Sequence, residues 1–207
     1  MSSFSKITGI ENNSISVGSS SKIHVDCAVE FKKFHNGSGG DNNLVQIGDN
    51  CNIRLLKVSI QGIGNKLIIG DNCKLNGALN IGIIGTNRTV TIGSNCTING
   101  AFINCRDEDI VIGNDCLFSN EIKIRSSDAH KIFDAATKEQ INSPKSPVTI
   151  GNHVWVGQGV FIGKNAAIPD GCVVGTRAVI TKKFEEPNCI IGGIGGRVIR
   201  QGIYWEQ

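Results

Sequence analysis

Residues 126–134, "SSDAHKIFD", contain His130, one of four histidines in the 207-residue chain. A neutral imidazole can accept a proton near pH 7, so His130 is a candidate general base. Asp128 stands two residues earlier, and an extended segment would place both side chains on one face, where the carboxylate could orient the imidazole. An aspartate in a loop also commonly bonds its own backbone to stabilise a turn, which we favour for Asp128. For His130 itself the alternative is an ordinary solvated histidine.

This stretch interrupts a six-residue repeat. Steps of six from residue 150 meet only aliphatic residues, four of them followed by glycine: Ile150, Val156, Ile162, Ile168, Val174 and Ile180. A smaller apolar residue follows each of the first five by four positions: Val154, Val160, Ala166, Cys172 and Ala178. Neither a helix nor a simple strand has this period. A six-residue repeat is typical of a β-helix, in which each hexad forms one short strand and a corner.

The repeat extends towards the N-terminus with looser spacing. "IGDNC" at 47–51 and 69–73, "IGSNC" at 92–96 and "IGNDC" at 112–116 follow a weaker "IHVDC" at 23–27, at intervals of 24, 22, 23 and 20 residues. Each interval is an 18-residue coil plus two to six extra residues. We therefore predict one all-β domain over 1–207, a parallel β-helix with irregular coils over 1–91, regular coils over 92–183 and a tail over 184–207.

The hexads from Ile112 continue through Phe118 and Ile124, and the next inward position falls on His130. The count resumes only at Ile150. The sequence thus predicts a protruding loop over 130–149, inserted at one corner, with the coil ending on His130. Loops of this length on a rigid scaffold commonly carry function.

Two further features need an explanation. Trp155 follows the inward Val154 and should project outward, either as part of a ligand site or packed under the loop or at a subunit contact. Six of the eight cysteines occupy the small inward position of their hexads, and none forms a C-x-x-C pair: Cys27, Cys51, Cys73, Cys96, Cys116 and Cys172. We interpret them as small core residues and predict no metal site.

Composition narrows the function classes. The net charge is +3, and no basic run is interleaved with aromatic residues, so we expect no nucleic-acid partner. No stretch reaches the roughly 18 apolar residues of a membrane span, which argues against membrane insertion. The first ten residues lack the apolar core of a secretory signal, so we expect a cytoplasmic protein.

The repeats support a resemblance to a known family. "IGNHVWVGQGVFIGKNAAIPDGCVVGTRAVITKKFEEPNCIIGG", residues 150–193, resembles the C-terminal coils of left-handed β-helix, hexapeptide-repeat acyltransferases. The resemblance runs from about residue 112 to residue 200 and weakens towards residue 23. "IRSSDAHKIFD" followed by "INSPKSPVTIGNHVW" is similar to bacterial capsule and exopolysaccharide O-acetyltransferases, including those that modify sialic acid polymers.

The resemblance implies acetyl-CoA as donor, a carbohydrate acceptor, no metal, and a homotrimer with sites between subunits. It implies that His130 is the catalytic base, which takes the proton of a sugar hydroxyl and returns it to the CoA sulfur. Donor-binding residues implied in the same way are Trp155, Gly157, Gly175, Thr181, Lys182, Arg197 and Arg200. Weaker candidates for contacting the acceptor are Asn104, Arg125 and Asp128; for Asn104, a local register shift that uses Ile103 as the inward residue is the alternative.

The chain departs from the family pattern at two places. Lys131 follows His130 where the family usually has proline or a small residue, and "GGIGGRVIR" at 192–200 replaces a Pro-Ala turn with Gly195 and Gly196. Three other functions stay open: N-acetylation of an amino sugar, a non-enzymatic scaffold or binding module, and a γ-class carbonic anhydrase. The last needs three zinc-binding histidines between subunits, and only His130 and His153 stand near the expected place.

Overall fold

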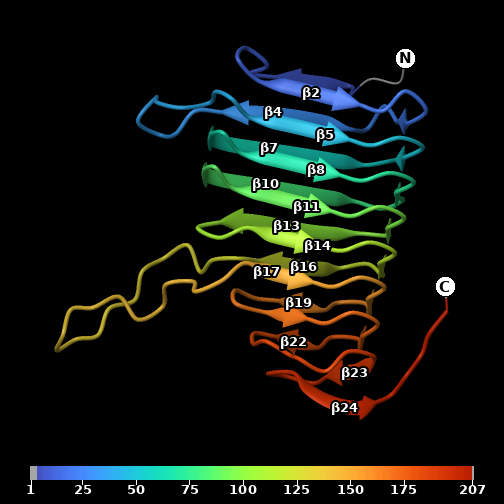
Figure 1. Cartoon of the computed structure of the whole chain (residues 1–207). Coiled ribbons are helices and arrows are strands. Elements are labelled where there is room, and N and C mark those ends of the chain that lie inside the picture. The colour runs from blue at the N-terminus through green and yellow to red at the C-terminus, as the bar shows by residue number, and fades with distance from the viewer. Residues whose placement is uncertain (1–3, 207) are drawn as a thin grey trace.

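A computed structural model describes residues 4–206, which form a parallel β-helix (Figure 1). The coils stack from the blue N-terminal end to the red C-terminal end, and each full coil adds one strand to each of three sheets. Neighbouring strands within a sheet pair in parallel, with the C-terminal strand as the exception. The described residues contain no helix, and hence none that is long and apolar enough to cross a membrane.

The strands that we group as sheet A are β1 (Lys6–Thr8), β4 (Ala28–Lys32), β7 (Leu56–Ile63), β10 (Leu79–Thr86), β13 (Ala101–Arg106), β16 (Ile122–Arg125), β19 (Phe161–Ile162) and β22 (Val179–Ile180). Sheet B contains β2 (Ser14–Val17), β5 (Leu44–Ile47), β8 (Lys66–Ile69), β11 (Thr89–Ile92), β14 (Ile110–Ile112), β17 (Val148–Ile150) and β20 (Ala167–Ile168). Sheet C contains β3 (Lys22–Ile23), β6 (Asn52–Ile53), β9 (Lys74–Leu75), β12 (Thr97–Ile98), β15 (Leu117–Phe118), β18 (Trp155–Val156), β21 (Val173–Val174), β23 (Cys189–Gly192) and β24 (Arg197–Gln201).

The core is a continuous stack of inward aliphatic residues and cysteines. All eight cysteines are buried as free thiols, which confirms the interpretation of six of them as core residues and adds Cys105 and Cys189. Burial raises the pKa of the Cys105 thiol to about 12. Such thiols stay protonated at neutral pH and behave as small apolar side chains.

The corner that follows each sheet B strand explains the repeated "IG-x-N-C" pattern. The residue before the cysteine has a left-handed backbone, with φ of 57° at Asn50, 58° at Asn72 and 61° at Asn95. Asparagine tolerates this region better than other side chains with a Cβ, which accounts for its recurrence. His153 occupies the same corner one coil after Asp115, with φ of 53°.

Three predicted boundaries differ from the structure. The loop leaves the coil after β16 and returns at β17, so it spans 126–147 rather than 130–149. The coils also continue beyond residue 183, because β23 pairs in parallel with β21 before β24 turns back antiparallel. The N-terminal coils are not irregular: they pair in continuous register, and their extra residues lengthen the sheet A strands.

Candidate functional site

The loop over 126–147 protrudes from the corner between sheets A and B (Figure 1). Its first arm is tied to the preceding coil by two buried serines. The Ser126 hydroxyl donates to the Arg106 carbonyl at 2.8 Å and accepts from the Arg106 amide at 2.9 Å. The Ser127 hydroxyl donates to the Asp107 carboxylate and accepts from the Ala129 amide at 3.0 Å. These bonds turn the chain away from the coil before it reaches residue 130.

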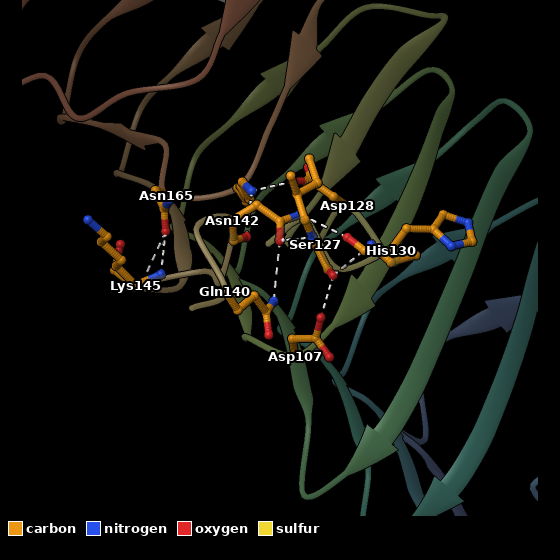
Figure 2. Close-up of polar contacts among 12 residues, drawn as sticks. Asp107, Ser127, Asp128, His130, Gln140, Asn142, Lys145 and Asn165 are labelled. Atoms are coloured by element: carbon orange, nitrogen blue, oxygen red, sulfur yellow. Dashed lines mark hydrogen bonds and ion pairs between the residues drawn. The ribbon is translucent and has the colours of Figure 1, made fainter. Parts of the chain in front are cut away.

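His130 is consequently exposed, and the prediction that the coil ends on it is wrong, because β16 already ends at Arg125. The chain has already left the coil axis at Ser126 and Ser127, and a histidine in the apolar stack would lose its hydration. Figure 2 shows the imidazole pointing away from the polar contacts that surround its backbone. It borders a hollow of about 310 Å³, lined also by Arg106, Lys131 and Gln140. The ring nitrogens therefore face open space beside polar and basic side chains.

Asp128 does not orient the imidazole. Its carboxylate is paired with the Lys164 ammonium. It also accepts a hydrogen bond from Asn142 Nδ2 at 3.0 Å (Figure 2). The hydrogen bond from Lys164 lowers the pKa of Asp128 below its ordinary value, and the Asn142 amide adds to the effect. The bonds of Asp128 thus reach the far arm of the loop and the next coil, and extend beyond a local turn.

Two of the weaker acceptor candidates, Asn104 and Arg125, lie side by side on the outer face of sheet A, whereas Asp128 lies in the loop. Asn104 is the register partner of Arg125, and Ile103 is the buried inward residue. The local register shift, in which Ile103 takes the inward position, is therefore confirmed. Arg125, Asp128 and Lys164 line a second hollow of about 170 Å³. Arg125 Nε is itself buried and has no hydrogen-bond partner in the described chain.

The predicted donor residues fall into two groups. Trp155 lies on β18, and Arg197 and Arg200 lie on β24, so these residues belong to sheet C. Gly157 and Gly175 directly follow strands of the same sheet. Thr181 and Lys182 instead follow β22 in sheet A, and Thr181 lines the hollow with Arg125. The seven predicted donor-binding residues are thus divided between two sheets of one chain, and that chain does not bring them together.

Gly157 and Gly175 differ in the space that the structure leaves for a side chain. A Cβ on Gly157 would stand 2.8 Å from the Val174 carbonyl oxygen, so packing between coils already demands glycine there. At Gly175 the nearest atom to a Cβ would be 3.6 Å away. Coil packing therefore does not require glycine at Gly175. A ligand that approached this backbone closely would require it.

Trp155 projects outward as predicted, with 39% of its surface exposed, and its aromatic neighbour comes from the C-terminal tail. The Trp205 ring lies 6.1 Å from Trp155 and stacks on His153 at 4.1 Å. Trp205 Nε1 donates to the His153 carbonyl at 3.0 Å, while His153 Nε2 lies 3.1 Å from the Trp205 carbonyl oxygen. His153, expected at the surface or an interface, is thus held by the tail.

Two of the described histidines already have hydrogen-bond partners, which bears on the carbonic anhydrase alternative. His24 Nε2 is hydrogen-bonded to Asn52 at 2.8 Å, and His153 is occupied by Trp205. Within residues 4–206 no group of three or more histidine, cysteine, aspartate or glutamate side chains is placed to hold a metal.

Sequence reasoning missed the residues that hold the site in place. Lys164 and Asn142 lie 36 and 14 residues after Asp128, and no local pattern connects them. Trp205 could have been noticed, because a tryptophan in a polar tail usually covers something.

No family model matches the chain. Among curated proteins, a polysialic acid O-acetyltransferase of Neisseria meningitidis is 34% identical over 125 residues, which cover 60% of this chain and 57% of the relative. A polysialic acid O-acetyltransferase of Escherichia coli O1:K1 / APEC is 33% identical over 98 residues, which cover 47% and 31%. The chain thus spans less than two thirds of the length of these curated relatives.

Solved structures extend the similarity over nearly the whole chain. The polysialic acid O-acetyltransferase OatWY matches with a TM-score of 0.87 and 31% identity, covering 99% of this chain and 92% of that chain. The predicted fold is confirmed by this match: a parallel β-helix, as the hexads indicated, with the left-handed turn that the family resemblance implied. The chain belongs to the left-handed β-helix, hexapeptide-repeat acyltransferases, and within them to the capsule-type O-acetyltransferases.

Proposed function

We propose that the protein transfers an acetyl group from acetyl-CoA to a hydroxyl of a bacterial surface polysaccharide or of its sugar precursor. The observation that carries the proposal is the placement of His130, whose imidazole faces an open hollow on a loop anchored at both ends. The similarity to polysialic acid O-acetyltransferases supports the reaction class and a polysaccharide acceptor.

In the proposed mechanism, neutral His130 accepts the proton of the acceptor hydroxyl. The hydroxyl oxygen forms a bond to the thioester carbonyl carbon and gives a tetrahedral intermediate. When the carbon–sulfur bond breaks, the imidazolium returns its proton to the CoA sulfur. The products are the acetyl ester and CoA thiol, and the enzyme ends in its starting protonation state.

We infer that donor binding involves the sheet C group. Trp155 and the open backbone at Gly175 would contact the pantetheine arm, with Gly157 beside them. Arg197 and Arg200 are exposed on β24 and would meet the phosphates. Thr181 and Lys182 would extend this site only from the sheet A side of a second subunit.

This division supports a homotrimer with sites between subunits. His130 protrudes from the corner between sheets A and B, whereas Trp155 faces outward from sheet C. In a prism of three sheets, the corner between two sheets lies opposite the third. One chain therefore separates the proposed base from the proposed donor wall, and a neighbouring chain would bring them together.

We place the reaction in the cytoplasm, where acetyl-CoA is available.

The proposal is tested by measuring thiol release from acetyl-CoA. Wild type and His130→Ala are compared with a panel of capsule polysaccharides and oligosaccharides as acceptors. Loss of the base should lower kcat by about 10²–10⁴-fold. The buried protein thiols should contribute little to a thiol-reagent signal while the chain stays folded. Unchanged turnover in the variant would remove His130 from the mechanism. A product that resists hydroxylamine would indicate N-acetylation, and failure to bind CoA would favour a scaffold.

A further inference from the structure

Three side chains, Asp128, Asn142 and Lys164, join the loop to the coil that follows it, and we call them the loop clamp. Lys164 comes two residues after β19, and its Nζ donates to the Asp128 carboxylate and, at 2.7 Å, to the main-chain carbonyl of Asn142. Asn142 Nδ2 donates to Asp128 Oδ2 at 3.0 Å and to the His130 carbonyl at 2.8 Å (Figure 2). The clamp therefore connects the outgoing arm, the returning arm and the next coil.

The clamp holds the backbone of His130, whose side chain is otherwise free. In the part of the chain that the structure describes, no hydrogen bond to the imidazole is found. The preceding residue, Ala129, has a φ of 66°, a left-handed conformation that alanine seldom adopts. A ring without a side-chain partner takes its direction from its own backbone. That backbone is fixed by the Ala129–Ser127 bond on one side and by Asn142 on the other.

We propose that Lys164, Asp128 and Asn142 are positioning residues for His130, a role that rests on the proposed function of His130 as the base. None of them needs to touch the acceptor or the donor. Their contribution is to keep the imidazole within reach of the acceptor hydroxyl, where a displacement of about 1 Å can cost about 10²-fold in rate. The clamp should therefore affect kcat and leave donor affinity unchanged.

The charges around Asp128 suit this role across the working pH range. Lys164 faces the carboxylate directly, and Arg125 lies in the same hollow. The hydrogen bond from Lys164 holds the carboxyl pKa below its ordinary value, so the ion pair is intact at neutral pH and is lost only as pH falls through the lowered pKa. The clamp should therefore stay closed through the neutral range in which the rate is measured.

The decisive variant is Lys164→Met, which removes the ammonium and keeps an apolar stem of similar length. We expect kcat to fall about 10- to 100-fold, with the KM for acetyl-CoA within about twofold of wild type. Lys164→Arg restores a donor to both oxygens and should recover most of kcat. Lys66→Met, at an exposed side chain of β8 far from the loop, is the matched control and should behave as wild type.

A second measurement follows the loop without relying on catalysis. Amide hydrogen exchange over 128–142 should become faster in Lys164→Met and stay unchanged in Lys66→Met. The double variant Asp128→Asn with Lys164→Met should lose little more activity than Lys164→Met alone, because both substitutions break the same ion pair.

The outcomes separate the two proposals. Wild-type kcat in Lys164→Met, combined with an inactive His130→Ala, would overturn the positioning role and leave the base in place. Full activity in His130→Ala would overturn the proposed mechanism, whatever the exchange data show. A parallel rise in KM, or no recovery with Lys164→Arg, would also contradict positioning, since either would mean that Lys164 acts on binding or folding.

Discussion

The coils before the loop and the coils after it form the corner between sheets A and B in different ways. Before the loop, β7 and β10 are eight residues long and pair in register along their whole length. After the loop, β19 and β22 are two residues long, and only residues 163–166 separate β19 from β20. The same sheet thus carries extra residues in one half and none in the other.

The loop over 126–147 is a third solution at the same corner. The extra residues before it are absorbed as strand, so their backbone groups pair and inward side chains such as Ile60 and Ile83 are buried. In the loop, no residue from 128 to 147 is buried. An insertion at this corner therefore either enlarges the scaffold or stands outside it, held by polar contacts. Only the second kind leaves side chains such as His130 free for chemistry.

Removing the loop should separate scaffold from function most sharply. Extending the register of β16 with β19 and of β17 with β20 by one residue aligns Arg125 with Gly163 and Val148 with Ala166, which leaves Lys164 and Asn165 between them. Replacing residues 126–147 with Lys-Asn should give a continuous β-helix without His130. Because no side chain from 126 to 147 belongs to the hydrophobic core, the unfolding midpoint should change little, while acetyl transfer falls by about 10²–10⁴-fold.

The replacement is checked by thermal unfolding followed by circular dichroism and by thiol release from acetyl-CoA. His130→Ala in the intact loop is the control for the chemistry, and the two variants should be similarly inactive. A graft that fails to fold would contradict the independence of scaffold and loop. A graft that retains activity would place the catalytic group elsewhere.

The fold was predictable because the same position of every hexad carries the side chain that faces inward. Ile150, Val156 and Ile162 are all buried, as their spacing indicated. The repeat could not indicate how extra residues at a corner are used, since strand extension and loop both lengthen the interval between "IG-x-x-C" motifs. The long strands β7 and β10, and the continuation through β23, therefore came only from the structure.

The difference between coil and loop can also be measured with one type of substitution. Phe118 is fully buried in the coil stack, whereas Phe133 in the loop is 53% exposed. Phe118→Ala should lower the free energy of unfolding by about 3–5 kcal/mol, because it leaves a cavity in a close-packed core. Phe133→Ala should change it by less than about 0.5 kcal/mol.

Denaturant unfolding of both variants gives the two values directly. Comparable losses would mean that the loop contributes to the core after all, and the contrast between the two regions would fail. Equal slopes against denaturant are expected, since neither substitution changes the surface exposed on unfolding by much.

The site was predictable only in part, for a reason of geometry. His130 and Trp155 were singled out from where they interrupt or follow the repeat. The loop clamp depends on which coil meets the returning arm of the loop, and a contact between Asp128 and Lys164 has no signature in the sequence. The same is true of the hollow that Arg125 shares with Thr181.

The C-terminal tail is a second segment outside the regular coils, and it is held by aromatic packing instead of charge. Trp205 is only 7% exposed, stacked on His153 and beside Trp155. Trp205→Ala should lower the free energy of unfolding by about 1–3 kcal/mol, less than Phe118→Ala, from lost burial and stacking. Tyr204→Ala is the control, since that side chain is 80% exposed and should have almost no effect.

The chain contains two tryptophans, so Trp155 is the sole indole fluorophore in Trp205→Ala. Loss of its aromatic cover should make Trp155 fluorescence easier to quench with iodide than the fluorescence of Tyr204→Ala, which retains both indoles. Unchanged quenching together with an unchanged unfolding midpoint would show that the tail does not hold this part of sheet C. If quenching rises while KM for acetyl-CoA stays constant, the tail fixes the corner at His153 without shaping the donor site. A raised KM would link the tail to the wall that Trp155 is proposed to form.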